Sequence, residues 1–318
     1  MRSLVTGITG FVGSHLARHL ISNKENVIGL SRWRSPKDNM QDILSKVDLR
    51  EADLTDLSSL LKVLGDTKPQ YIYHLAAQSF VPASFDRPKE TFEANTLGTL
   101  NLLEAIRILK INPVVHICST ADVYGDVKKD EMPISESNPL RPVSPYAVSK
   151  VSCELLAKQY FDSFGIKSVI TRAFNHTGPG RGEVFAESSF AKQIAEVEKK
   201  QRPGVIYVGN LKSVRTYADV RDIVKAYYIV LRMGKSGEIY NIAGENTLTM
   251  EKLLKTLLKF SPIGSNIKIK IDKNRLRPAE AVSKIPNDKK FRKISRWKPT
   301  IPIEKTLSDL LVYWRGRV

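Results

Sequence analysis

Tyr146 and Lys150 could together carry acid–base chemistry, because residues four positions apart on a helix share one face. The segment 146–164 is predicted to form that helix. A nearby ammonium favours the phenolate, so we expect Lys150 to lower the pKa of Tyr146 from about 10 toward neutrality. At such a pKa the phenol can donate and recover a proton. The pattern Tyr-x-x-x-Lys is also common on ordinary helix surfaces, so it needs support from other residues.

Thr120 offers such support. It closely follows the apolar run 114–118, which predicts a strand. In parallel α/β sheets, ligands bind beyond the carboxyl ends of the strands. A hydroxyl at that position is placed to hydrogen-bond the same substrate oxygen that Tyr146 would protonate.

A glycine-rich turn near the N-terminus predicts what reagent these residues would use. A short apolar strand at 4–5 precedes Gly7, Gly10 and Gly13, and residues 15–21 continue with helical spacing. Glycines let the backbone approach a pyrophosphate, and the N-terminus of a helix offers unpaired N–H groups to the anion. Three glycines alone would also suit a tight turn. The strand before them and the helix after them favour nucleotide binding.

The residues after the second predicted strand, 27–30, discriminate between the two nicotinamide dinucleotides. Folds that bind NAD usually place Asp or Glu at the end of this strand, where it grips the ribose hydroxyls. This chain has Arg32 and Arg34 instead. Guanidinium groups suit a 2′-phosphate, so the sequence favours NADP. Two surface arginines that merely follow a strand remain the alternative.

Predicted strands alternate with predicted helices through the first half of the chain. Strands are expected at 27–30, 47–49, 71–75, 114–118 and 168–170, and helices through 64, over about 88–110 and over 146–164. This alternation predicts an α/β fold with a Rossmann-type doubly wound parallel sheet. The loop 121–145 contains four prolines and is too long to be idle in a compact domain.

Beyond residue 174 the pattern changes to a glycine-rich loop and a helix over about 190–199. A helix at 219–232 and a strand at 238–242 are expected to return to the first layer. We therefore expect residues 1–172, with about 216–243, to form an NADP-binding domain. Residues 173–215 and 244–318 are expected to form a smaller, interleaved C-terminal substrate domain.

Composition narrows the class of protein. The chain has 318 residues, of which 42% are hydrophobic and 26% charged, as is typical of a soluble globular protein. No stretch approaches 18 consecutive apolar residues and no signal-peptide core precedes the first strand, so we expect a cytoplasmic protein with no membrane partner. Cys118 and Cys153 are expected to be reduced and buried, without a metal.

The formal charge of +17 raises the possibility of nucleic-acid binding. The basic residues are spread over most predicted elements, however, and no nucleic-acid-binding motif accompanies them. A lysine-rich surface together with a site for an anionic small molecule accounts for the same charge. We therefore expect no nucleic-acid partner.

As a set, the motifs resemble the extended short-chain dehydrogenase/reductases that modify nucleotide sugars, nearly from end to end. The matching motifs are Gly7-x-x-Gly10-x-x-Gly13, His74-Leu-Ala-Ala, Asn95-x-x-Gly98-Thr-x-Asn-Leu-Leu-Glu104, Ser119-Thr-Ala-Asp-Val-Tyr-Gly125 and Ser144-Pro-Tyr-Ala-Val-Ser-Lys150. Within that family, the segments 174–180, 190–195, 208–211 and 275–278 are most similar to the GDP-mannose branch. That branch contains a 4,6-dehydratase and a reductase that acts on the product of the dehydratase.

The resemblance implies a role for each matching residue. Tyr146 would be the general acid, Lys150 would bind the nicotinamide ribose, and Thr120 would orient the C4 oxygen of the sugar. The cofactor NADP or NADPH would be held by Gly7, Thr9, Gly10, Phe11, Val12, Gly13, Arg32, Arg34, Asp53, Leu54, Leu75, Ala76, Ala77, Tyr146 and Lys150. A GDP-linked sugar would contact Gln78, Ser79, Thr120, Asn175, Arg181, Asn210, Arg215, Arg275, Arg277 and Glu280, with the last three arginines on the pyrophosphate and Glu280 on the nucleoside ribose.

Asp122 bears on which of the two activities the chain has. The dehydratases that the motifs resemble carry Glu at this position, where it handles the C5 and C6 protons during water elimination. Asp is one methylene shorter, and a misplacement of about 1 Å can cost on the order of a hundredfold in rate. The segment Asn175-His-Thr-Gly-Pro179, where dehydratases tend to have Asn-His-Glu-Ser-Pro, also favours the reductase.

The favoured reaction is therefore NADPH-dependent reduction of the C4 keto group of GDP-4-keto-6-deoxy-mannose to a GDP-6-deoxyhexose such as GDP-rhamnose. The 4,6-dehydratase is the alternative. A non-catalytic redox-sensing or nucleic-acid-binding module is a third possibility, which the intact set of Thr120, Tyr146 and Lys150 disfavours. Family members commonly pair through the helix that carries the tyrosine and the helix before it, so we expect a homodimer.

Overall fold

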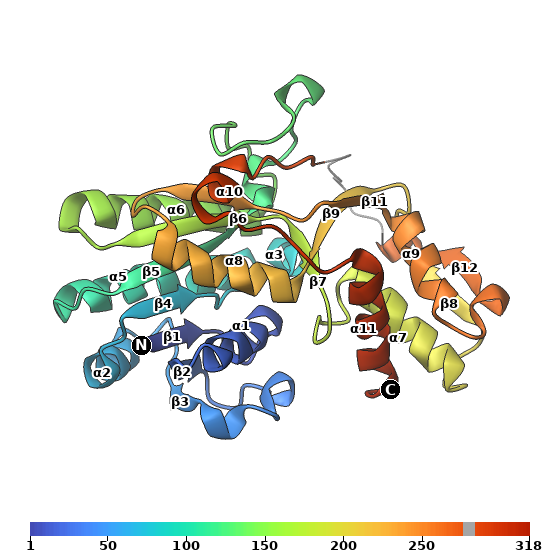
Figure 1. The fold of residues 1–318 in the computed structure, drawn as a ribbon, viewed down its shortest axis with the longest axis horizontal. Helices are drawn as coiled ribbons and strands as arrows, with labels where there is room; N and C mark the ends of the chain where they lie inside the picture. The colour runs from blue at the N-terminus through green and yellow to red at the C-terminus, as the bar shows by residue number, and fades with distance from the viewer. Residues whose placement is uncertain (276–283) are drawn as a thin grey trace.

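The structure is a computed structural model that describes residues 1–275 and 284–318. A seven-stranded parallel sheet lies at its centre, with strand order β10-β6-β5-β4-β1-β2-β3 (Figure 1). In chain order the strands are β1 (Arg2–Thr6), β2 (Asn26–Ser31), β3 (Asp48–Glu51), β4 (Tyr71–His74), β5 (Val114–Thr120), β6 (Ser168–Ala173) and β10 (Ile239–Ile242). The predicted fold class, a Rossmann-type doubly wound α/β sheet, is confirmed.

Helices cover both faces of this sheet. One face carries α1 (Phe11–Ser22), α8 (Val220–Met233) and α10 (Lys289–Ser295), and the other carries α2 (Leu57–Thr67), α5 (Gly98–Ile108) and α6 (Pro145–Phe164). Successive side chains of a strand point to opposite faces of the sheet, so each strand contributes to both layers: Leu4 packs into one core and Val5 into the other. Both residues are fully buried, as are most strand residues of a sheet covered on two sides.

A further hydrophobic core, separate from the two that cover the faces of the sheet, lies beyond one end of the sheet, on the right in Figure 1. It is built by α7 (Ala186–Glu198), α9 (Met250–Lys259), α11 (Ile303–Arg315) and β8 (Val205–Val208), whose parallel partner β12 (Lys268–Ile271) is exposed. A small sheet of β7 (Asn175–Thr177), β9 (Val214–Asp219) and β11 (Asn246–Thr249) joins the two parts. Strand β9 runs directly into α8, whose first turn is capped by the Asp219 carboxylate.

The long helix expected over 88–110 is interrupted. After α3 (Val81–Asp86), the chain forms α4 (Pro88–Phe92), a π-helical turn over Glu93–Leu97 and then α5. The Asn95 carbonyl at this turn accepts hydrogen bonds from the Thr99 hydroxyl at 2.6 Å and the Cys153 thiol at 3.2 Å. The Cys153 thiol of α6 thus contacts the turn from outside this helix, a tertiary contact that the local spacing did not predict.

The segment between β5 and α6 begins with a 3₁₀ turn, Ala121–Tyr124, and contains another at Lys129–Glu131. Gly125 ends the first turn at a φ of +59°, and a Cβ there would lie 1.6 Å from the Arg141 carbonyl oxygen. The other 3₁₀ turns are Asp38–Met40, Leu44–Lys46, Gly264–Asn266 and Lys273–Arg275. Strand β5 itself extends to Thr120, two residues beyond the expected end.

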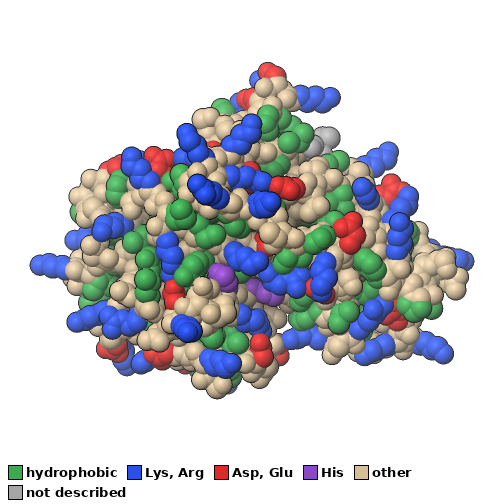
Figure 2. All heavy atoms as spheres, in the orientation of Figure 1, with side chains coloured by type: hydrophobic (Ala, Val, Ile, Leu, Met, Phe, Trp, Pro, Cys, Tyr) green, Lys and Arg blue, Asp and Glu red, His purple; other side chains and the backbone are tan. Residues whose placement is uncertain are grey.

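Charge on the visible face is dispersed. Figure 2 shows Lys and Arg side chains over both parts of the molecule, interspersed with Asp and Glu. Among the helices in the described residues, none has the length and apolar character needed to cross a bilayer.

Candidate active site

The glycine turn after β1 is closely packed. A Cβ on Gly13 would lie 2.2 Å from the carbonyl oxygen of Gly7, and one on Gly7, whose φ is +68°, would lie 2.8 Å from Cα of Ala76. The Gly10 N–H donates to the Gly7 carbonyl at 3.0 Å and closes the turn. A Cβ at Gly7 or Gly13 would clash with these backbone atoms, so glycine is required where the turn packs against the start of helix α1.

The surroundings of this turn fit a phosphorylated dinucleotide. Gly10 is the N-cap of α1 and supplies no side-chain acceptor to the first turn of N–H groups. Arg32 and Arg34 are exposed directly after β2, which pairs with β1, and the Arg34 guanidinium lies 4.0 Å from the Trp33 ring centroid. N-terminal N–H groups and two guanidiniums at one sheet edge are what a pyrophosphate and a further phosphate require.

The remaining predicted cofactor residues lie along the same edge of the sheet. The backbone N–H groups of Leu75 and Ala76 donate to the Thr6 hydroxyl at 3.1 and 3.0 Å, which fixes the turn after β4 beside the glycine turn. The others follow β1, β3 and β4: Thr9, Phe11 and Val12; Asp53 and Leu54; and Ala77.

Tyr146 and Lys150 lie on the first two turns of α6, as predicted. The Ser144 hydroxyl accepts a hydrogen bond from the Ala147 N–H at 3.1 Å and caps the helix, and Pro145 occupies its first position. Tyr146 is 8% exposed and Lys150 6%. The Lys150 ammonium donates to the carbonyl oxygen of Cys118 on β5 at 2.8 Å.

The pKa of Tyr146 moves in the direction opposite to our expectation. Burial raises it well above its usual value, and the negative charge of Asp122 raises it further, whereas the Thr120 hydroxyl opposes the rise. The prediction that Lys150 brings this pKa toward neutrality is therefore wrong for the protein alone. Its physical reason is desolvation of the phenolate, which a sequence spacing does not report.

Thr120 and Asp122 are brought to this phenol by the 3₁₀ turn that follows β5. The Asp122 N–H donates to Thr120 Oγ1 at 3.2 Å, so the threonine caps the turn that carries the carboxylate. Asp122 Oδ1 accepts a hydrogen bond from Lys284 Nζ at 2.9 Å, and the same ammonium donates to the Ala121 carbonyl at 3.1 Å.

Arg181, in the loop 178–185 between β7 and α7, lies beside the first residue of α1. Its guanidinium lies 3.4 Å from the Phe185 ring centroid and 5.2 Å from that of Phe11, and it pairs with Glu187 at 3.5 Å. Burial lowers the pKa of Arg181, and its positive charge acts on Tyr146. Thus a cation, a phenol and the start of α1 surround one region at the carboxyl edge of the sheet.

The other predicted substrate residues occupy different elements. The Gln78 side-chain oxygen accepts a hydrogen bond from the Phe80 N–H at 2.6 Å, and Ser79 between them is exposed. Arg275 donates to the Ser189 hydroxyl of α7 at 3.0 Å. The remaining residues are Asn175 on β7, Asn210 after β8 and Arg215 on β9. Arg277 and Glu280 lie outside the described residues.

Residues that sequence reasoning did not single out support the site from behind. Glu154 and Arg172 form an ion pair at 2.7 Å with side chains 4% and 3% exposed, and Ser119 donates to Glu154 at 2.5 Å. Glu154 stands eight positions after Tyr146, a helical spacing that could have indicated it. Lys284 carried no such signal.

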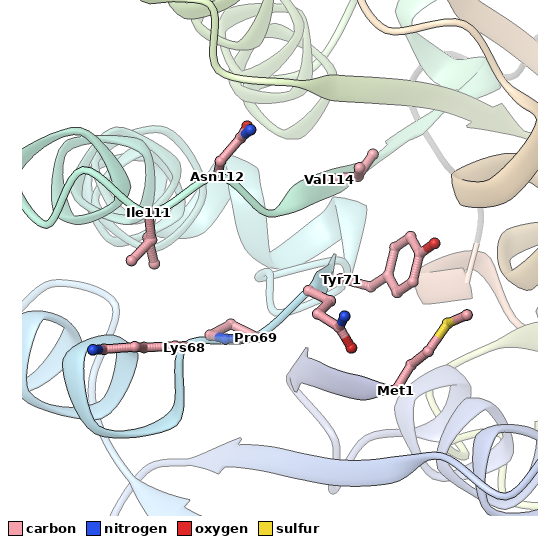
Figure 3. Close-up of a pocket in the computed structure, with 8 residues that line it drawn as sticks. Met1, Lys68, Pro69, Tyr71, Ile111, Asn112 and Val114 are labelled. Atoms are coloured by element: carbon pink, nitrogen blue, oxygen red, sulfur yellow. The ribbon is translucent and has the colours of Figure 1, made fainter.

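A pocket of about 390 Å³ lies at the opposite edge of the sheet (Figure 3). It is lined at the amino ends of β1, β4 and β5 by Met1, Tyr71 and Val114, together with Lys68 and Asn112. None of the predicted catalytic residues reaches it. In residues 1–275 and 284–318, no group of three His, Cys, Asp or Glu side chains is arranged to hold a metal ion.

Comparisons with known proteins agree with this architecture. GDP-6-deoxy-D-mannose reductase of Pseudomonas aeruginosa is 32% identical over the whole chain and 98% of that protein. GDP-mannose 4,6-dehydratase of Yersinia enterocolitica is 30% identical over 98% of this chain and 92% of the relative. The solved structure of RMD from Pseudomonas aeruginosa complexed with NADPH matches with a TM-score of 0.86, 31% identity and coverage of 100% and 99%.

Fold likeness extends to other nucleotide-sugar enzymes. UDP-glucose 4-epimerase of Thermotoga maritima, solved with UDP-glucose, matches with a TM-score of 0.88 at 26% identity and covers 99% of each chain. The sequence profile of the family described as GDP-mannose 4,6 dehydratase matches residues 4–310, nearly the full length. The chain therefore belongs to the GDP-mannose 4,6 dehydratase family, a branch of the extended short-chain dehydrogenase/reductases.

Proposed function

We propose that the chain is an NADPH-dependent reductase of GDP-4-keto-6-deoxy-mannose that yields a GDP-6-deoxyhexose such as GDP-rhamnose. The observation that most supports this proposal concerns Asp122, two residues after Thr120. The dehydratases that the motifs resemble carry Glu at this position, and the Asp122 carboxylate accepts a hydrogen bond from Lys284 at 2.9 Å. A carboxylate that is one methylene shorter and engaged with an ammonium is poorly suited to remove a proton from C5.

Three features support NADPH as the cofactor. The glycine turn before α1 packs too closely to accept a Cβ on Gly13, which would lie 2.2 Å from the Gly7 carbonyl oxygen, and the exposed Arg32 and Arg34 suit a 2′-phosphate. A relative 31% identical was solved with NADPH. When bound, NADPH supplies the hydride.

The chain's own residues would handle the proton and the orientation. Tyr146 donates its phenolic proton to the C4 oxygen as that carbon is reduced, and Thr120 hydrogen-bonds the same oxygen. Lys150, anchored on the Cys118 carbonyl, hydrogen-bonds the nicotinamide ribose. Arg181 contributes positive charge beside the developing alkoxide.

The proposal is tested by mixing the purified protein with GDP-4-keto-6-deoxy-mannose and NADPH and following the reduced-nicotinamide absorbance. We expect consumption of one NADPH for each keto sugar reduced. No absorbance change at high enzyme concentration would refute the reductase. Product analysis then gives the configuration at C4.

The 4,6-dehydratase is the second candidate, because the family profile and relatives at about 30% identity carry that name. Such an enzyme reduces and reoxidises bound NADP within one turnover. It would convert GDP-mannose without net cofactor consumption. That result would replace the reductase by the dehydratase.

We further propose the domain division and a homodimer. Residues 1–172 with about 216–243 would bind NADPH, and residues 173–215 with 244–318 would bind the GDP-sugar. Four exposed apolar side chains on the π-turn, α5 and α6 support pairing of two copies: Leu97, Ile108, Val148 and Leu155, which is 62% exposed. Light scattering should give a dimer for the native chain and a monomer for Leu155→Asp, whereas Val312→Asp on α11 should leave the mass unchanged.

A further inference from the structure

Lys284, in the C-terminal part of the chain, contacts the 3₁₀ turn Ala121–Tyr124, here called the catalytic turn. Its ammonium donates to Asp122 Oδ1 at 2.9 Å and to the Ala121 carbonyl at 3.1 Å, across 162 residues of sequence. The lysine side chain is 14% exposed, whereas that of Asp122 is 47% exposed. An ammonium so far removed from water needs fixed anionic or carbonyl partners, and the turn after Thr120 provides both.

The backbone around Lys284 is fixed by two other segments. The Thr216 hydroxyl of β9 donates to the Lys284 carbonyl at 3.4 Å. On the other side, the Ile134 N–H donates to the Ile285 carbonyl at 2.8 Å, and the Asn287 N–H donates to the Ile134 carbonyl at 2.8 Å. Lys284 therefore holds the catalytic turn from a position that both β9 and the loop before α6 determine.

The charge of this pair acts on the proton donor. Asp122 is the strongest electrostatic influence on Tyr146 after burial, and it raises the pKa of the phenol. Further titratable groups that act on Tyr146 include Cys118 of β5, Arg181 of the loop 178–185 and Tyr227 of α8. The Lys284 ammonium reduces the rise in pKa that the Asp122 carboxylate causes at the phenol. The reason is that opposite charges 2.9 Å apart largely cancel at a third group.

We propose that Lys284 is a positioning residue of the reduction, which neutralises Asp122 beside Tyr146 and holds the turn that carries Thr120. This inference rests on the proposed reductase activity. In the step itself, the keto group takes two electrons as the hydride that NADPH would supply, leaving NADP⁺, so that the C4–H bond forms while the C4=O double bond becomes single. The Tyr146 O–H bond breaks, and its proton goes to the C4 oxygen. Asp122 exchanges no proton with the sugar in this step, and its Oδ1 accepts the hydrogen bond from Lys284.

Lys284→Met, which keeps the length and removes the charge, tests the proposal. Tyr146 must be protonated to act, so the alkaline limb of kcat/KM reports its pKa. Without the Lys284 charge beside Asp122, that limb should move to higher pH, and kcat/KM at neutral pH should fall about tenfold, since a weaker acid donates more slowly. Lys284→Arg should restore most of the activity.

Two further variants separate charge from structure. Lys284→Met combined with Asp122→Asn removes both charges and should return the alkaline limb toward its native position. Lys290→Met is the matched control, because Lys290 also bridges a carboxylate, Glu238, and a carbonyl, that of Ile239, each at 2.7 Å. Its pH profile should equal that of the native chain. An unmoved limb in Lys284→Met, or the same loss in Lys290→Met, would overturn the proposal.

The native chain in the same assays separates this inference from the proposed function. Each protein is given the keto sugar with NADPH and, separately, GDP-mannose with NADP. The pKa of Tyr146 is read from the alkaline limb of the first reaction, in which the phenol donates a proton, or from the acid limb of the second, in which it accepts one. If the native chain turns over neither, the proposed function fails and amide exchange of residues 121–125 decides the inference. Faster exchange in Lys284→Met than in Lys284→Arg is the expected result, and equal exchange would overturn it.

Discussion

The Lys150 ammonium lies 2.8 Å from the carbonyl oxygen of Cys118 and donates a hydrogen bond to it. This contact joins the second turn of α6 to β5, two residues before Thr120. The strand that presents the threonine and the helix that presents Tyr146 are thereby held in one arrangement. The proposed catalytic residues Thr120, Tyr146 and Lys150 thus lie on regular elements, where their mutual geometry is more closely fixed than on loops.

Tyr146→Phe should remove the proton donor without changing the shape of the site. We expect kcat to fall by about 10²–10⁴-fold, the range for a positioned general acid, with an NADPH dissociation constant within about twofold of the native value. Steady-state kinetics and NADPH fluorescence titration measure the two effects. Undiminished kcat would exclude Tyr146 as the acid.

Lys150→Met, unlike Tyr146→Phe, should weaken NADPH binding, because it removes the proposed hydrogen-bond donor to the nicotinamide ribose.

Replacing Arg32 and Arg34 together by Ser should abolish the preference for NADPH. A hydrogen bond to a charged group contributes about 1.5–3 kcal/mol, so each guanidinium that contacts the 2′-phosphate corresponds to roughly 10–100-fold in affinity. Binding of NADH, which lacks this phosphate, should be unchanged. Isothermal titration with both dinucleotides makes the comparison. Equal losses for NADH and NADPH would show that the arginines do not read the phosphate.

Gly13→Ala should damage the cofactor turn, because the added Cβ would lie 2.2 Å from the Gly7 carbonyl oxygen and 2.7 Å from Cα of Ile8. Overpacking of this kind costs about 1–3 kcal/mol, and the displaced turn should also lose NADPH affinity. Gly65→Ala in α2 is the control, since its nearest neighbour would be 3.7 Å away and alanine favours helices. Urea unfolding should show destabilisation for the first variant only.

Two buried histidines predict that the protein loses stability in mild acid. Burial lowers the pKa of His74 to about 3 and that of His116 to about 3, against about 6.5 in an unfolded chain. Between these values the unfolded state binds more protons, so stability rises with pH and is lost as pH falls below about 6.5. At pH 5 the loss is about 2 kcal/mol for each histidine.

The slope of unfolding free energy between pH 5 and 7.5 measures this effect. His116→Gln keeps a polar side chain but cannot titrate, so its stability should depend less steeply on pH than that of the native chain. A native slope of zero, or a slope that the variant leaves unchanged, would contradict the assignment.

The sequence predicted those parts of the site in which local pattern and backbone geometry determine the outcome. The spacing of Gly7, Gly10 and Gly13 predicted the turn that joins β1 to α1. The four-residue interval between Tyr146 and Lys150 placed both on one helix. The fold class followed from alternating strands and helices, and the family from the motifs taken together.

What the sequence did not predict depends on burial and on distant contacts. The pKa of Tyr146 rises because the phenol is desolvated, which no spacing reveals. The π-turn at Glu93–Leu97 interrupts the predicted helix beside Cys153, whose thiol donates to the Asn95 carbonyl although the two residues are 58 positions apart. Lys284 meets Asp122 across 162 residues, and no local periodicity relates them.

Transfer of deuterium tests the central claim most directly. The protein is incubated with GDP-4-keto-6-deoxy-mannose and NADPH that carries deuterium at the transferable position of the nicotinamide ring, and the sugar product is examined by NMR. The reductase predicts one deuterium at C4 of a GDP-6-deoxyhexose for each NADPH consumed. Unreduced keto sugar, together with conversion of GDP-mannose in a parallel sample that consumes no NADPH, would contradict it.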